Sequence, residues 1–486
     1  TDGLILHLDA GNKNSYSGSG ATWTDLSGNG YNATLINSVG YSSNSGGMLT
    51  FNGSTQVAQV NVNSFVRNNT TYTFSSFFYL TTSDGGAPFC MMTTPNDTNN
   101  NDGFWQHLNL TNWLWRTEDA VSGEFGQRPI SYLLLNQKGD STNYGYIHLG
   151  SFYAEFGKRN GKRCSVDVLN EINSLKSSKV EGIILDLRNN GGGSLSDAVD
   201  MVGYFIKAGP VVQVDGVGQA PESYTDRDPD QQFTKPLVVM VNNFSASASE
   251  ILAAAMQDYK RAIVIGSKQT YGKGTVQNII DLNRMIRSNT NGDMGAFKFT
   301  TQKYYRINGG STQLEGVKSD VVVPDRYSYI DIGEKDQDNP LAWDEIAPAK
   351  YTIWNNVFDY ETTIQNSKNR MNSSAEIKLI DDNARWIKTM RDQSVYSLNF
   401  SKYSQHIKLN ETKAKRFDVL SEYQTNLTFK SLPYERPLME QDSVFKINRT
   451  RWYENLSKDI YMEEAINVLS DLNNSHNTSK LAQVKE

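Results

Sequence analysis

The chain of 486 residues contains few of the residues that build metal centres and disulfide frameworks. Its two cysteines, Cys90 and Cys164, are too few for a disulfide-stapled scaffold or for a zinc site made of thiolates. Its five histidines are widely spaced, and none occurs between His148 and His406. A nucleophile within that interval has no histidine nearby in the sequence. It would need either a histidine from a distant segment or a base of another residue type.

Long apolar runs and an excess of positive charge are also missing. No apolar run approaches the ~20 residues that a membrane-spanning helix requires, so we expect no transmembrane segment. The 47 Lys and Arg residues are outnumbered by 53 Asp and Glu residues, and the net charge of -6 gives no reason to expect a nucleic-acid partner. Hydrophobic residues make up 38% of the chain, which is enough for packed cores, and the length suits two or three domains.

Charged residues divide the chain into parts of different composition. The first 122 residues contain only eleven of them, about 9%, against about 24% in the remaining 364 residues. The 1–122 segment is rich in Ser, Thr, Asn and Gly, and turn sequences such as Ser27-Gly-Asn-Gly30 separate its short apolar runs. We therefore expect an all-β sandwich over 1–122. Its expected strands include Gly3–Leu8, Met48–Phe51, Gln56–Val62 and Thr71–Leu80.

Two further segments follow. Between residues 128 and 330, apolar runs typical of buried strands alternate with helical patterns, which predicts a largely parallel sheet covered by helices. Residues 335–486 contain charged amphipathic stretches and little glycine, which predicts mostly helix. The expected elements of the middle segment are strands at Val180–Leu187, Pro236–Val241 and Ala262–Gly266, and helices at Leu195–Ile206 and Ser249–Tyr259.

Two motifs of the middle segment suggest a reaction at the ends of strands. Asp186-Leu-Arg-Asn-Asn-Gly-Gly-Gly193 follows an expected strand, and its glycines allow backbone N–H groups to face a ligand, although a tight turn explains them equally well. Asn243-Phe-Ser-Ala-Ser-Ala-Ser-Glu250 opens an expected helix, where the helix dipole stabilises negative charge. Taken alone, Ser245, Ser247 and Ser249 are more simply explained as helix caps.

A third motif, Thr270-Tyr-Gly-Lys-Gly-Thr-Val-Gln277, places Lys273 between two glycines. If residues 273–277 are extended, Lys273 and Gln277 lie on the same face. A lysine is usually a solvated surface charge. Burial can, however, lower the pKa of a lysine until it serves as the base for a serine, and no histidine is near. Together the three motifs favour a hydrolase with a Ser–Lys mechanism.

These motifs resemble those of the carboxyl-terminal processing proteases, in particular the tail-specific protease branch. The resemblance implies an α/β protease core of the crotonase-like type at 128–330 and a helical C-terminal domain at 335–486. It also implies a serine endopeptidase that needs no metal and no organic cofactor. Beyond the three motifs it is carried by Lys303–Gln313, Gly316–Pro324, Leu341–Glu345, Tyr396–Phe400 and Asp459–Glu463.

Carried over residue by residue, the resemblance implies that Ser247 is the nucleophile and Lys273 the general base. Gln277 matches the residue that orients the lysine. The backbone N–H groups of Gly193 and Ala248 match the oxyanion hole of the family.

Two departures from the family pattern are visible. The loop 266–272 is one residue longer, and it contains a second lysine, Lys268, which we reject as the base because it lacks flanking glycines. We also expect no PDZ domain, because the core begins within a few residues of Gly126-Gln-Arg-Pro129.

The 1–122 segment resembles the laminin-G-like, concanavalin-A-like jelly rolls through Asp2–Gly11, Trp23–Gly30 and Phe51–Gly53. Such domains are usually longer, so we expect an incomplete sandwich. The resemblance suggests a glycan as its ligand. Two alternatives stay open: a carbohydrate-binding or adhesion protein with an idle protease core, and an inactive chimaeric fragment.

For the protease, the resemblance implies protein or peptide substrates, captured by their C-termini. It also implies the periplasm or cell envelope of a bacterium. The chain begins at Thr1 with no signal peptide, so this location rests on the resemblance alone.

Overall fold

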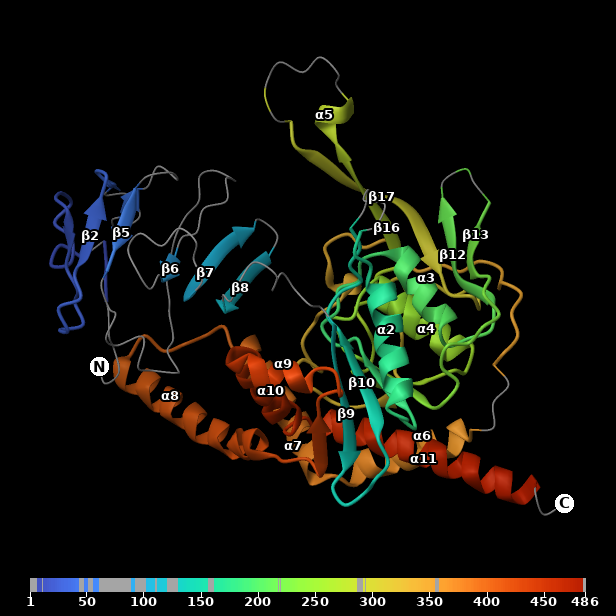
Figure 1. Ribbon diagram of the computed structural model, residues 1–486. Helices are drawn as coiled ribbons and strands as arrows, with labels where there is room; N and C mark the ends of the chain where they lie inside the picture. The colour runs from blue at the N-terminus through green and yellow to red at the C-terminus, as the bar shows by residue number, and fades with distance from the viewer. Residues whose placement is uncertain are drawn as a thin grey trace. The chain divides into compact units, whose positions relative to one another are not determined.

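The computed structural model describes residues 7–10, 12–42, 48–50, 56–60, 89–91, 102–109, 112–119, 130–155, 161–216, 218, 220–285, 292, 294–354 and 358–483 (Figure 1). The chain forms two compact units, residues 1–127 and 128–486. Each unit is described by itself.

The described part of the first unit consists of short strands in three small sheets. Their strand orders are β1-β2-β5, β3-β4 and β6-β7-β8, and all pairs are antiparallel. The strands predicted near residues 48 and 56 correspond to β4 and β5, whereas Thr71–Leu80 lies outside the described residues. The bounds are β1 Thr22–Trp23, β2 Ala33–Ile36, β3 Gly40–Ser42, β4 Met48–Thr50, β5 Val57–Gln59, β6 Phe89–Met91, β7 Asp102–Asn109 and β8 Asn112–Asp119.

A buried carboxylate organises the turn expected at residues 27–30. Asp25 Oδ1 accepts hydrogen bonds from the backbone N–H groups of His7 and Ser27, both at 2.8 Å. Asp25 Oδ2 accepts from the Ser27 hydroxyl at 2.7 Å and from the Tyr31 N–H at 3.1 Å. These bonds replace the water that Asp25 loses on burial, so the turn is fixed by a side chain rather than by a strand ladder.

The second unit is built on a seven-stranded sheet of order β18-β15-β14-β11-β10-β9-β19. The five strands from β18 to β10 are parallel, as the sequence predicts, while β9 and β19 pair antiparallel at one edge. The outer strand β19 comes from the C-terminal part of the chain, so this sheet joins residues that are far apart in sequence. The bounds are β9 Ile130–Gln137, β10 Tyr144–Leu149, β11 Ile183–Asp186, β14 Leu237–Val241, β15 Ile263–Gly266, β18 Val321–Val322 and β19 Leu427–Lys430.

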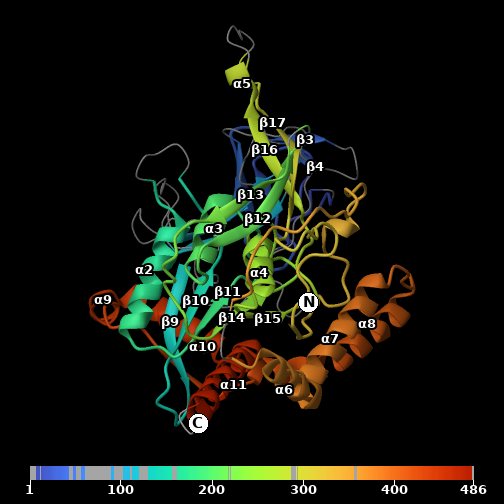
Figure 2. The same ribbon diagram turned by 90° about the vertical axis from the view of Figure 1, so that its right-hand side faces the viewer.

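Both faces of this sheet are buried, which explains the unbroken apolar runs of β11 and β14. Leu185 and Val239 pack with α2 (Cys164–Ser177), α3 (Leu195–Gly203) and α4 (Ala248–Asp258). Ile184 and Val238 belong to a second core on the opposite face, which includes residues of α6 and α11. Figure 2 shows α3 and α4 on one side of the sheet and α6 and α11 on the other.

A smaller antiparallel sheet of order β13-β12-β17-β16 lies beside the α4 layer. Its strands β16 and β17 extend as a long hairpin away from the rest of the unit, with α5 near its end (Figure 1). The bounds are β12 Gly209–Gly216, β13 Glu222–Asp226, β16 Thr275–Asp281, α5 Leu282–Met285 and β17 Ala296–Tyr305.

The described residues of the C-terminal segment are mostly helical, as the amphipathic pattern predicts. No helix within the described ranges is both long enough and apolar enough to cross a membrane. The bounds are η2 Glu334–Asp336, α6 Tyr360–Ser373, α7 Ala375–Asp392, α8 Phe400–Ala414, η3 Lys415–Glu422, α9 Arg436–Gln441, α10 Ser443–Leu456 and α11 Ile460–Gln483.

Candidate active site

The three motifs singled out in the sequence lie on loops that follow neighbouring parallel strands. Residues 187–193 follow β11, residues 242–247 follow β14, and residues 267–274 follow β15. Because parallel neighbours end at the same edge of a sheet, these loops meet, and that edge is where open α/β sheets bind ligands.

Ser247 has an unusual backbone conformation. It is the N-cap of α4, with φ 57° and ψ -114°, a combination that costs a non-glycine residue free energy. The next residue, Ala248, is the first of the helix, so its N–H has no acceptor within the helix. The turn therefore places a hydroxyl and a backbone N–H without an intrahelical acceptor side by side at a helix N-terminus, the arrangement that a serine nucleophile with an oxyanion hole requires.

The structure distinguishes the three serines of the motif. Ser245 and Ser249 are fully buried, and their hydroxyls donate to the carbonyl oxygens of Leu187 at 2.8 Å and Asn190 at 2.9 Å. Ser247 lies between buried neighbours but is itself partly exposed. The outer two serines thus anchor the turn to residues 187–190, and the middle one is accessible to a substrate.

Two glycines of the first motif are required by close contact with neighbouring backbone. Gly192 has φ 99°, and a Cβ there would lie 2.7 Å from both Ala246 O and Ser247 Cβ. Gly193 has φ 141°, and a Cβ there would overlap Phe152 O. The absence of a side chain therefore lets Gly192 approach the Ser247 turn and lets Gly193 pack against Phe152.

Lys273 and Gln277 are brought together in the third loop. Lys273 Nζ donates to Gln277 Oε1 at 3.1 Å. Lys273 precedes the first residue of β16, and the pairing of β16 with β17 shifts register between Val276 and Gln277. The two side chains meet, but across a β-bulge and not along the regular extended strand that the sequence suggested.

The environment of Lys273 disfavours its charged form. Burial lowers the pKa of its amine below 10.5, and the positive charge of Lys298 lowers it further, while Glu334 and Glu250 act in the opposite direction. The hydroxyls of Tyr304 and Thr312 both donate to the Lys273 carbonyl and fix its backbone. Lys268, by contrast, is exposed to solvent.

A residue that the sequence analysis did not assign connects the serine to the lysine. Glu250 is fully buried, and its Oε2 accepts hydrogen bonds from the N–H of Ser247 at 2.7 Å and of Lys273 at 3.1 Å. Its Oε1 accepts from the Thr270 hydroxyl at 2.6 Å and from the Gly272 N–H at 2.7 Å. One carboxylate thus holds both loops.

The signal for Glu250 was present in the sequence. Ser247-Ala-Ser-Glu250 has the spacing of a capping box, in which the glutamate accepts from the N-cap N–H. What the pattern could not reveal is that this carboxylate also binds the lysine loop, because Gly272 and Lys273 are more than twenty residues further along the chain.

Within the described part of the chain, no group of three or more His, Cys, Asp or Glu side chains is arranged to hold a metal ion. The groups that the site brings together are a serine hydroxyl, a partly buried lysine amine, a buried carboxylate and backbone N–H donors.

Comparison with known proteins agrees with this chemistry. Residues 143–323 match the model of peptidase family S41, and residues 327–474 match the model described as the C-terminal domain of tail specific protease. The tail-specific protease of Haemophilus influenzae is 40% identical over 271 residues, which is 55% of this chain and 38% of that protein. The carboxy-terminal-processing protease of Bartonella bacilliformis is 39% identical over 163 residues, 32% of this chain and 35% of that protein.

One solved structure, the photosystem II D1 C-terminal processing protease, overlaps 46% of this chain and 55% of its own, with 25% identity and a TM-score of 0.34. The chain spans less than two fifths of the length of the two curated relatives above.

Residues 143–323 are thus similar to peptidase family S41, and the segment that follows is similar to the C-terminal domain of the tail-specific proteases, as the motifs had indicated.

Proposed function

We propose that this chain is a serine endopeptidase of the tail-specific type, with Ser247 as nucleophile, Lys273 as general base and Gln277 as the residue that orients the base. The observation that carries the proposal is the shared acceptor Glu250 Oε2, which binds the backbone N–H groups of both Ser247 and Lys273. The nucleophile and the base are therefore parts of one hydrogen-bonded assembly.

The reaction proceeds through an acyl-enzyme. Ser247 Oγ attacks the carbonyl carbon of the scissile peptide while the neutral Lys273 amine takes the hydroxyl proton. The N–H groups of Gly193 and Ala248 donate to the oxyanion of the tetrahedral intermediate. The C–N bond then breaks, Lys273 returns the proton to the leaving amine, and a water activated by the same lysine hydrolyses the ester.

Substitution of the two central residues tests this mechanism with casein as a general substrate. We expect Ser247→Ala and Lys273→Ala each to lower the cleavage rate by ~10⁴ or more, because loss of a member of such a unit disables it entirely. Lys268→Ala is the matched control, since Lys268 is an exposed lysine of the same loop. Full activity in Ser247→Ala, or equal losses in Lys268→Ala and Lys273→Ala, would refute the assignment.

We further propose that the core is of the crotonase-like type and that the protein acts in the bacterial periplasm or cell envelope.

We also propose that the protease acts near the C-termini of protein substrates. The names of the carboxy-terminal-processing relatives and the tail-specific type of the domain at residues 327–474 support this substrate class. Mass spectrometry of the products from peptides with free or amidated C-termini tests it. Equal cleavage of both forms would contradict recognition of the terminal carboxylate.

For residues 1–122 we propose an incomplete concanavalin-A-like sandwich that binds a glycan. The antiparallel pairing of the described strands and the Asp25 turn within the matching segment Trp23–Gly30 support this proposal. A glycan array probed with the full chain tests it, and the absence of any saturable binding would contradict it.

A further inference from the structure

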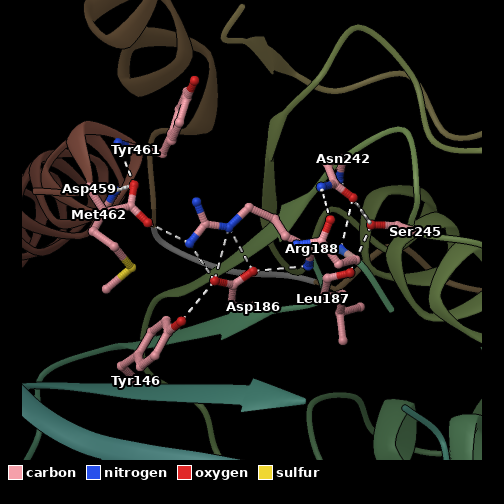
Figure 3. Close-up of polar contacts among 10 residues, drawn as sticks. Tyr146, Asp186, Leu187, Arg188, Asn242, Ser245, Asp459, Tyr461 and Met462 are labelled. Atoms are coloured by element: carbon pink, nitrogen blue, oxygen red, sulfur yellow. Dashed lines mark hydrogen bonds and ion pairs between the residues drawn. The ribbon is translucent and has the colours of Figure 1, made fainter. Parts of the chain in front are cut away.

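An ion-pair cluster connects the catalytic core to the C-terminal domain (Figure 3). Arg188 lies between two carboxylates, with Nη2 at 2.6 Å from Asp186 Oδ2 and 2.7 Å from Asp459 Oδ2. Tyr146 donates its hydroxyl to Asp186 Oδ2 at 2.8 Å. Asp186 and Arg188 belong to the S41 segment, whereas Asp459 lies 271 residues beyond Arg188 in the C-terminal domain.

The cluster is shielded from water. Asp186 is 1% exposed, and the side chains of Arg188 and Asp459 are 19% and 15% exposed. Burial alone would raise the pKa of Asp186, but the Arg188 guanidinium outweighs it and keeps that pKa below 3.8. The Arg188 guanidinium is held in this shielded position by its two carboxylate partners. Removal of one carboxylate would leave its charge poorly hydrated and only half paired.

Asp459 uses its two oxygens for different purposes. Oδ2 binds Arg188, while Oδ1 accepts the N–H groups of Tyr461 at 3.0 Å and Met462 at 3.3 Å in the first turn of α11 (Figure 3). Asp459 directly precedes α11 and so caps it. An asparagine could keep this cap, but it would not supply the charge that Arg188 binds.

Residues 187–192 connect Arg188 to the turn of Ser247 through hydrogen bonds. The Leu187 carbonyl accepts the Ser245 hydroxyl at 2.8 Å. The Asn190 carbonyl accepts the Ala246 N–H at 3.0 Å and the Ser249 hydroxyl at 2.9 Å. These bonds hold both flanks of Ser247, whose strained conformation persists only if its surroundings are rigid.

We propose that Asp459 is a positioning residue for catalysis: by holding Arg188 it fixes residues 187–192, and through them the turn of Ser247. The C-terminal domain would then be part of the catalytic apparatus without contributing a residue that touches substrate. The inference rests on the proposed protease function for its kinetic readout, but not for its structural one.

The test compares Asp459→Asn with Asp471→Asn in the full chain. Asp471 is also on α11, and its Oδ2 pairs with Arg370 Nη1 at 2.8 Å within the C-terminal domain. We expect Asp459→Asn to lower kcat roughly tenfold with KM changed less than twofold, because misalignment acts mainly on the transition state. Asp471→Asn should leave kcat unchanged.

Amide hydrogen exchange gives a readout that does not need activity. In Asp459→Asn, the amides of residues 245–249 should exchange faster than in Asp471→Asn, while those of α2, which contacts neither aspartate, should not differ. Equal kcat and equal exchange in the two variants would overturn the inference. If the unmodified chain cleaves nothing, the protease proposal fails and the exchange comparison decides the inference alone.

A second variant covers the case in which Asp459→Asn does not fold. Arg188→Lys keeps a positive charge but cannot bridge two carboxylates with a planar fork. It should lower kcat in the same way, and an unchanged kcat in Arg188→Lys would also overturn the inference.

Discussion

Lys273 must lose a proton before it can accept one from Ser247, so activity should rise with pH through the pKa of its amine. That pKa is lowered by burial and by Lys298, and raised by Glu334. We expect the rising limb of the kcat/KM profile to lie below pH 10.5. Lys298→Gln should move this limb to higher pH, because it removes a positive charge that lowers the pKa of Lys273. Glu334→Gln should move the limb to lower pH, because it removes a negative charge that raises that pKa.

These opposite shifts are the sharpest check on the role of the lysine. A profile that neither variant moves, or that persists in Lys273→Ala, would show that another group titrates.

Glu250 gives a prediction about stability rather than rate. Burial raises its pKa from 4.5 to about 7, although four hydrogen bonds counteract that rise. Between these two values the folded state binds a proton that the unfolded state has released, so the contribution of Glu250 to stability falls as pH rises. Relative to Glu250→Gln, the chain should lose up to about 3 kcal/mol of unfolding free energy between pH 5 and pH 8.

Urea unfolding of both forms at the two pH values measures this difference. Parallel pH dependence in the unmodified chain and Glu250→Gln would contradict the shifted pKa of Glu250.

At the scale of elements, the start of β16 determines where the base points. The bulge between Val276 and Gln277 lets the exposed Gln277 side chain reach back to Lys273 Nζ. We expect Gln277→Ala to lower kcat about tenfold with little change in KM, because an unaligned amine costs most in the transition state.

Asn278→Ala is the matched control for that measurement. Asn278 is the next residue of the same strand, is also exposed, and its amide donates to Thr301 Oγ1 on β17 at 2.9 Å. If both alanine variants lose activity equally, the effect belongs to the stability of the hairpin and not to the orientation of Lys273.

At the scale of the whole molecule, the structure predicts which cuts in the chain are tolerated. Residues 128–486 form one compact unit with two cores of its own. Expression of 123–486 should therefore give cooperative unfolding and casein cleavage equal to those of the full chain. Non-cooperative unfolding of 123–486 would show that residues 1–122 complete the fold.

A cut at residue 330 is the contrasting case. It removes β19, which pairs with β9 at the sheet edge, and it removes Asp459, which pairs with Arg188. It also strips α6 and α11 from one face of the sheet. A 128–330 fragment should consequently fail to fold, and its cooperative unfolding would contradict this account.

The sequence by itself determined the buried strands, the helix that starts at the serine motif and the pairing of Lys273 with Gln277, while Ser247 was singled out among three serines by the family resemblance. The pattern-based inferences depend on neighbours along the chain: apolar runs, glycines that permit unusual φ values, and the spacing of a few residues between partners. The predicted strand Val180–Leu187 is longer than β11, because the Val180 N–H bonds to Leu175 O of α2 and the Glu181 N–H bonds to Asn143 O, both outside the ladder.

Only the tertiary structure decided how these candidates are held. Glu250 binds the loop of Lys273 from more than twenty residues away, β19 joins the sheet from residue 427, and Asp459 reaches Arg188 across 271 residues. Each of these contacts is made between segments that no local pattern relates, and each satisfies a buried polar group or strand edge. The partners of Glu250, β19 and Asp459 are therefore decided by which segments the folded sheet brings together. The strained turn of Ser247 is stable only where such contacts hold it in place.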